Sequence, residues 1–190
     1  MNRETVARRL VHFLIALAPI YYLLPEDLPV IGLDRWVVLI AFFAIAMVIE
    51  AVRLPKGILV FGMRPHEKNQ IASFAWAAAG ITAALWLFPH DIAAGTLIGM
   101  AFVDPLAGEL RARRVDIPRE LAASLITYFG ICAAALALAN DRVLPTILLL
   151  SVVGAVVAVA SEHFKNKYLD DDFLMLVAPG IVMTALALVL

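Results

Sequence analysis

The chain of 190 residues is 63% hydrophobic, only 16% of its residues are charged, and its formal net charge is −1. A soluble domain of this length carries more charge and shorter apolar runs, and the balanced charge lacks the basic field that nucleic-acid binding needs. The single cysteine, Cys132, excludes a disulfide framework within the chain and a cysteine-rich metal site.

Seven apolar segments follow one another along the chain, several of them close to the roughly 20 residues that a membrane-spanning helix needs. Because lipid forces backbone polar groups to pair within helices, they predict a single all-α domain over residues 1–190, a polytopic bundle of about seven transmembrane helices. The first segment lacks a clean signal-peptide cleavage site and is interpreted as a spanning helix. The fourth is short and contains Gly95 and Gly99, so it could be tilted, broken or buried. The segments are residues 8–24, 36–53, 71–88, 91–104, 119–139, 143–161 and 173–190.

The cations alternate between the two ends of these segments. Only Arg35 and Arg142 lie in loops on one side. All the others lie before the first segment or after the second, fourth and sixth: Arg3, Arg8, Arg9, Arg53, Lys56, Arg64, Lys68, Arg111, Arg113, Arg114, Arg119, Lys165 and Lys167. Since basic loops stay in the cytoplasm, the N-terminus is predicted to be cytoplasmic. Most of the acidic side chains then face the cytoplasm as well, which argues against a channel.

Two acidic groups border apolar segments on that side. Asp104 ends the fourth segment, and an acid at the membrane edge is expensive unless it is paired or functional. It is either an interfacial carboxylate paired with Arg111 or Arg113, or a ligand of a divalent cation such as Mg²⁺. The run Asp170–Asp172 stands directly before the last segment, where it is either a solvated stop or part of a site.

Arginines accompany these acids. The segment "RARRVDIPRE" carries Arg111 and Arg119, either as a membrane anchor at the lipid head groups or as a polyphosphate-binding group at a helix start. Asp116 is expected to cap the helix that Pro118 opens.

Earlier in the chain, Glu50 and Arg53 lie three residues apart on one helix face and are expected to pair, either structurally or as part of a site. Arg64 and Glu67 repeat that spacing in the following loop. The histidines show no shared metal-ligand spacing and are interpreted as interfacial, although His163 follows Glu162 directly.

Taken in order, these motifs resemble the polyprenol kinase family, which includes dolichol kinase, phytol kinase and the CTP-dependent diacylglycerol kinase. The resemblance runs from about Glu50 onward. It rests on Glu-x-x-Arg at a helix end, on "MRPHEKNQ" with Arg64 and Glu67, on Asp104 in "FVDPLAGE", and on Glu162 followed by "LDDDF". The chain departs from the family where Asp172 replaces an asparagine and Arg119 replaces a lysine, and where "LRAR" and "RELAAS" stand in place of a glycine-arginine turn and a glutamate-glycine pair.

The resemblance implies a lipid-alcohol kinase in the cell membrane, or in a membrane of the endoplasmic reticulum type, with its site facing the cytoplasm. It would transfer the terminal phosphate of CTP, or another nucleoside triphosphate, to a polyprenol-type or diacylglycerol hydroxyl with Mg²⁺, and its partners would be that lipid, the nucleotide and membrane lipids. The alternatives are a CTP-dependent lipid-phosphate nucleotidyltransferase, which releases pyrophosphate, and a non-enzymatic membrane protein.

The resemblance also assigns roles to residues. Metal binding falls to Asp104 and Asp171, with Asp170 supporting, and the acceptor proton to Glu162 or Asp172. Nucleotide binding falls to the paired and basic side chains: Glu50, Arg53, Arg64, Glu67, Arg111 and Arg119.

Overall fold

The computed structural model describes residues 10–28, 32–60, 62–139, 142–164 and 169–190. Its architecture is all-α, as predicted, with one antiparallel pair of two-residue strands, β1 (Asp27–Leu28) and β2 (Leu33–Asp34). An N-terminal helical segment, Leu10–Leu23, ends in the 3-10 helix η1 (Ala18–Leu23). The remaining helices are α2 (Arg35–Lys56), η2 (Pro65–Asn69), α3 (Ser73–Leu87), α4 (His90–Ala112), α5 (Ile117–Ala139), α6 (Leu144–His163) and α7 (Asp171–Ala187).

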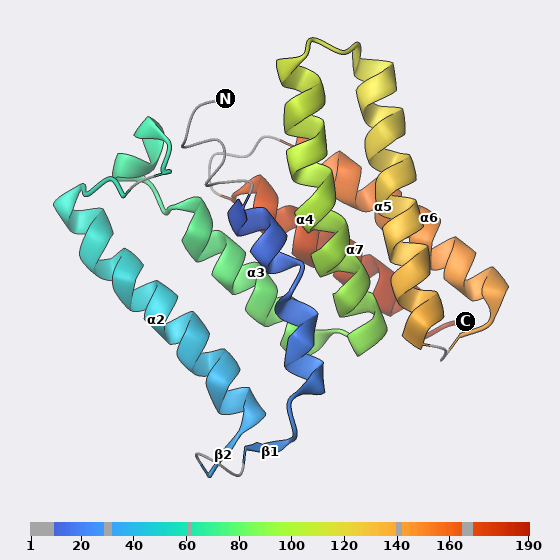
Figure 1. Ribbon diagram of the computed structural model, residues 1–190, viewed down its shortest axis with the longest axis horizontal. Helices are drawn as coiled ribbons and strands as arrows, with labels where there is room; N and C mark the ends of the chain where they lie inside the picture. The colour runs from blue at the N-terminus through green and yellow to red at the C-terminus, as the bar shows by residue number, and fades with distance from the viewer. Residues whose placement is uncertain (1–9, 29–31, 61, 140–141, 165–168) are drawn as a thin grey trace.

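Helices α4 to α7 form the body of the molecule, and α2 stands at its edge, packed mainly against α3 (Figure 1). Successive helices run in opposite directions. The end of α4 and the start of α5 therefore lie at one end of the molecule, while β1, β2 and the C-terminus lie toward the other end (Figure 1). We call the first of these the α4–α5 end.

Four described helices, α2, α4, α5 and α6, are long and apolar enough to cross a membrane. Helix α5 shows the pattern most clearly, because its buried residues recur every fourth position as Glu120, Ser124, Tyr128, Cys132 and Leu136. Beyond Arg119 in the first turn, its outward side chains are mainly apolar, and Ile126 and Leu138 are strongly exposed. Polar groups inside and apolar groups outside are typical of a helix surrounded by lipid.

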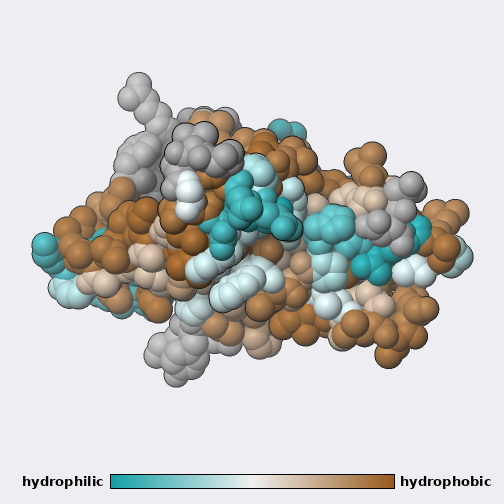
Figure 2. Space-filling view, turned by 90° about the horizontal axis from the view of Figure 1, so that it is seen from below, coloured by the Kyte–Doolittle hydropathy of each residue, from teal (hydrophilic) through white to brown (hydrophobic). Residues whose placement is uncertain are grey.

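Figure 2 views the molecule from the end that carries β1 and β2, and shows hydrophilic residues gathered in the middle of this face, with hydrophobic residues over most of the rest. One polar contact at this end, Asp91 with Arg142, was not foreseen from the sequence. Asp91, in the first turn of α4, is buried and is paired with the guanidinium of Arg142 from the α5–α6 connection. The pair ties this connection to the start of α4.

The fourth apolar segment, expected over residues 91–104, is one continuous helix that runs eight residues beyond Asp104 to Ala112. The apolar run stops just before Pro105, where a helix ordinarily ends, yet neighbouring helices allow a membrane helix to continue through proline. Gly95 and Gly99 let α4 lie close against α5, facing Cys132 and Tyr128 respectively. Small residues four apart serve this kind of close approach, so the segment is buried and unbroken.

This close packing predicts the effect of a methyl group. A Cβ at Gly99 would lie 2.7 Å from a ring carbon of the fully buried Tyr128, so we expect Gly99→Ala to lower stability by about 1–3 kcal/mol through overpacking. Gly108, on the same helix, has no atom within 4 Å of the position that a Cβ would take, and Gly108→Ala should leave stability unchanged or raise it. Thermal unfolding in detergent compares the two, and equal midpoints would contradict the close approach.

Candidate functional site

Glu50 and Arg53 form the predicted ion pair, and both are buried at the end of α2. Arg53 Nε and Nη2 donate to the two oxygens of Glu50, each at 2.7 Å. The same guanidinium donates to the carbonyls of Ile58, Glu67 and Gln70, and Glu50 accepts the Ala72 N–H. We call this arrangement the α2 clamp. Because the N–H groups of Arg53 bind Glu50 and the carbonyls of Ile58, Glu67 and Gln70, the clamp holds the backbone at these positions and leaves no donor of Arg53 for a nucleotide.

Glu67 is buried in the loop that the clamp holds. Its carboxylate accepts the backbone N–H groups of Arg64 and of Ser73, the first residue of α3. Burial alone would raise the pKa of this carboxyl, but the two backbone donors outweigh it and the pKa is lowered. Glu67 therefore caps α3 as an anion, while the side chain of Arg64 is exposed beside it.

The acidic run begins α7. Asp170 is its N-cap: one oxygen accepts the Asp172 N–H at 3.1 Å, and the other accepts the hydroxyl of Ser73 at 3.0 Å. Acidic side chains in the first turn of a helix interact favourably with the helix dipole. The run therefore stabilises the start of α7 and does more than end the loop before it. Burial, followed by the charge of Asp171, raises the pKa of Asp170 to about 6.

Asp104, from the middle of α4, lies beside Asp172 and His12. His12 Nε2 is 3.2 Å from an Asp104 oxygen, and ligand atoms of His12, Asp104 and Asp172 all lie within 4.8 Å of one another. The three aspartates 170–172 form a second such group. Asp172 belongs to both, so it joins carboxylates from two helices that are distant in sequence. We call His12, Asp104 and Asp170–Asp172 together the acidic centre.

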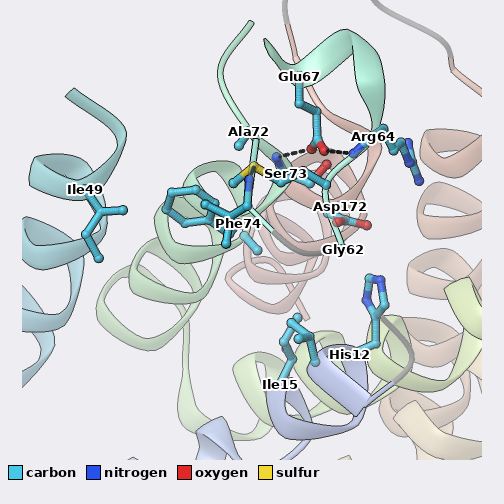
Figure 3. Close-up of a pocket in the computed structure, with 14 residues that line it drawn as sticks. His12, Ile15, Ile49, Gly62, Arg64, Glu67, Ala72, Ser73, Phe74 and Asp172 are labelled. Atoms are coloured by element: carbon cyan, nitrogen blue, oxygen red, sulfur yellow. Dashed lines mark hydrogen bonds between the residues drawn. The ribbon is translucent and has the colours of Figure 1, made fainter. Parts of the chain in front are cut away.

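A pocket of about 350 Å³ opens beside the acidic centre and is lined by Asp172, His12, Arg64 and Glu67. Figure 3 shows His12 on the N-terminal segment on one side and Asp172 and Arg64 on the other. The pocket shares Val11, Ile15, Ile49, Phe74 and Ala77 with a larger apolar groove of about 690 Å³, which lies between the N-terminal segment, α2 and α3. A pocket that carries four ionisable side chains in a mainly apolar lining thus continues into an apolar groove.

A third group of charged side chains lies at the ends of α4, α5 and α6. The guanidinium of Arg111 pairs with the buried carboxylate of Glu162 and lies 3.6 Å from Glu120. His163 lies between the same two acids. Asp104 is near enough for its charge to act on Glu162, so this group adjoins the acidic centre without lining the pocket.

Several residues lie elsewhere than the sequence indicated. Asp104 pairs with His12 in place of Arg111 or Arg113, and Arg113 binds Glu109 instead. Arg119 is 82% exposed and pairs with Asp116, so it does not join the other site residues. Arg3, Arg8, Arg9, Lys165 and Lys167 lie outside the described residues.

Three site residues were missed by sequence reasoning. The sequence predicts an interfacial position for His12, indicates no role for Glu120 and does not connect Ser73 with the acidic run. An ionisable side chain within an apolar segment is itself a signal of function. This signal is present at His12 and at Glu120. No local pattern connects Ser73 with Asp170, because they meet only through the packing of α3 on α7.

The cap at Asp170 predicts a pH dependence of stability in protein freed of divalent cations. Its pKa is about 6 when folded and ordinarily 3.8, so the folded state holds the proton more tightly. The contribution is fully present below about pH 3.8 and is lost as the pH rises through about 6. Asp170→Asn keeps a good cap and removes the charge. We therefore expect a flatter profile of melting temperature against pH in EDTA, and superimposable profiles would contradict the assignment.

The fold and the site define an all-α protein with four helices able to cross a membrane and with an acidic centre beside a partly apolar pocket. No model of a known protein family, no curated protein and no solved structure matches the chain. The resemblance to polyprenol kinases therefore stays a prediction.

Proposed function

We propose that this protein is a membrane-embedded lipid-alcohol kinase that transfers the terminal phosphate of a nucleoside triphosphate, CTP by the family resemblance, to the hydroxyl of a polyprenol-type lipid or diacylglycerol. The observation that carries the proposal is the continuity between the pocket at the acidic centre and the apolar groove. A hydroxyl on a long apolar tail fits this combination, since its polar end would meet Asp172 and its tail would lie in the groove.

The donor set of the acidic centre suits Mg²⁺, which is typically held by one or two carboxylates and the phosphates of a substrate. Asp104 and Asp171, which belong to different ligand groups joined by Asp172, would hold the ion, and Asp170, already bound to Ser73, would support the turn that presents Asp171 and Asp172. When bound, Mg²⁺ neutralises charge on the phosphates.

The chain's own side chains would position the reactants. Arg64, exposed at the pocket, would contact a phosphate of the nucleotide. Asp172 lines the pocket and Glu162 does not, so Asp172 would accept the proton of the lipid hydroxyl. His12 would hold Asp104 in place. The α2 clamp and the cap at Glu67 would act indirectly, by fixing the loop that carries Arg64.

The proposed orientation places the acidic centre at the cytoplasmic face. The N-terminal segment, α3 and α7 would cross the membrane with the four longer helices, giving seven spans and a cytoplasmic N-terminus. The alternation of helix direction in Figure 1 and the basic residues around the α4–α5 connection, Arg111, Arg113, Arg114 and Arg119, support this arrangement.

The test is a transfer assay with purified protein, Mg²⁺, labelled CTP, ATP, GTP and UTP, and a panel of prenols and diacylglycerols. A phosphorylated lipid together with a nucleoside diphosphate is expected. Release of pyrophosphate with a CDP-lipid would establish a nucleotidyltransferase instead. No labelled lipid from any combination would refute both enzymes.

A further inference from the structure

Glu120, Glu162 and His163 form a group separate from the acidic centre. Glu120 belongs to the first turn of α5, and Glu162 and His163 to the last turn of α6. One ligand atom from each residue lies within 4.8 Å of the others. The side chains of Glu120 and Glu162 are 2% and 1% exposed, whereas His163 is 36% exposed and leaves a path to solvent.

The two glutamates lack the donors that satisfy buried acids elsewhere in the molecule. Glu50 accepts three hydrogen bonds and Glu67 two. Glu120 Oε1, by contrast, is buried without a hydrogen-bond donor among the described residues. Among the described residues, Arg111 is the arginine that faces both glutamates; it is about half exposed and reaches Glu120 only at 3.6 Å. Asp104 adds further negative charge nearby. Two carboxylates out of water need more compensation than this.

The orientation of the His163 ring indicates that a cation compensates the charge of these two buried carboxylates. Its Nδ1 lies 3.0 Å from the carbonyl of Val159, one turn earlier in α6, and a carbonyl can only accept a hydrogen bond. With its proton on Nδ1, the ring turns the lone pair of Nε2 toward Glu120 Oε2, 3.4 Å away. Two lone pairs face each other there, so a cation belongs between them. A histidine that donates one ring N–H to a backbone carbonyl and offers the other nitrogen is typical of a metal ligand.

We propose that Glu120, Glu162 and His163 bind a divalent transition-metal ion such as Zn²⁺. Two carboxylates and one imidazole suit such an ion, whereas Mg²⁺ prefers oxygen ligands alone. Glu162 binds the ion through Oε2, which lies 3.2 Å from His163 Nδ1. The other oxygen of Glu162, Oε1, stays paired with Arg111. The ion joins the ends of α5 and α6. The site does not depend on the proposed kinase activity, because none of its three ligands lines the pocket.

The experiment titrates Zn²⁺ into metal-stripped full-length protein in detergent by calorimetry, in a large excess of Mg²⁺ that occupies oxygen-only sites. One Zn²⁺ should bind at this site per wild-type chain, and Asp104→Asn separates it from the group of His12, Asp104 and Asp172, which also combines an imidazole with carboxylates. Glu120→Gln and His163→Ala should each weaken binding at least about tenfold, since even the loss of a group that supports a ligand costs that much. Glu109→Gln removes a carboxylate that pairs with Arg113 on α4 and should bind Zn²⁺ as the wild type does. Asp104→Asn, which damages the acidic centre, should do so as well.

Melting temperatures keep the result interpretable. Without metal, Glu120→Gln should melt no lower than the wild type, because it removes a poorly compensated buried charge. At the same concentration of Zn²⁺, the wild type should gain more stability than Glu120→Gln. The proposal is overturned if the wild type binds no Zn²⁺ in excess Mg²⁺, or if Glu120→Gln binds it equally well. It is also overturned if Asp104→Asn alone abolishes binding. A proton shared between His163 and the glutamates would give the first of these results.

Discussion

Asp172→Asn is expected to lower the rate of lipid phosphorylation by about 10²- to 10⁴-fold, the usual contribution of a positioned acid or base. Asp172 is the residue that belongs to both carboxylate groups of the acidic centre and also lines the pocket. The substitution preserves size and removes the ability to accept a proton. The measurement is the initial rate with saturating nucleotide and lipid.

Asp116→Asn is the matched control for this experiment, because Asp116 is a half-exposed aspartate on the α4–α5 connection that pairs with Arg119. Its rate should equal that of the wild type. An Asp172→Asn rate within about twofold of the wild type, well below the usual effect, would remove Asp172 from the chemistry. The melting temperature of each variant shows whether a lost rate reflects a lost fold.

Arg53→Met is expected to reduce stability by about 3–5 kcal/mol, the cost of leaving one partner of a buried ion pair alone. Glu50 would keep its charge in a buried place, and the carbonyls of Ile58, Glu67 and Gln70 would lose their donor. The loop over residues 58–72 should then be cut more rapidly by protease, and the melting temperature in detergent should fall.

Two comparisons separate the α2 clamp from a general effect of losing an arginine. Arg113→Met, at the end of α4, removes a pair with Glu109 from an arginine that is 71% exposed and should change stability little. The double variant Glu50→Gln/Arg53→Met should recover part of the loss, since it leaves no buried charge unpaired. A single Arg53→Met protein as stable as the wild type would show that the pair contributes only geometry.

Contacts within one helix were the most predictable from the sequence. The three-residue spacing of Glu50 and Arg53 gave their pairing correctly, because both residues lie on one face of α2. The helical class also followed from the apolar runs. The end of α4 could not be predicted in this way. The apolar run stops at Asp104, while the helix, packed against α5, continues to Ala112.

Contacts between segments that are distant in the sequence could not be predicted in the same way. Asp104 had two arginines within reach along its own helix, and the sequence offered no reason to prefer His12 from the N-terminal segment. The place of Asp172 between the two carboxylate groups likewise depends on how α7 packs against α4. From the sequence, Arg111 and Arg119 had the same expected role. In the structure Arg111 pairs with the buried Glu162, whereas Arg119 is exposed and pairs with Asp116.

Helix α2 is tied to the molecule mainly at its ends. At one end Arg35 donates to the Leu24 carbonyl beside β1 and β2, and at the other the α2 clamp holds the loop before α3. Between them Leu39 and Ala46 are the buried side chains, and the apolar groove occupies the remaining space. In the proposed kinase, a thick lipid tail would displace the middle of α2, where the buried side chains are Leu39 and Ala46. The length of the tail would be limited instead by Tyr21 and Leu24, which line the groove near β1. We therefore expect the proposed kinase to select its lipids by tail length more than by tail thickness.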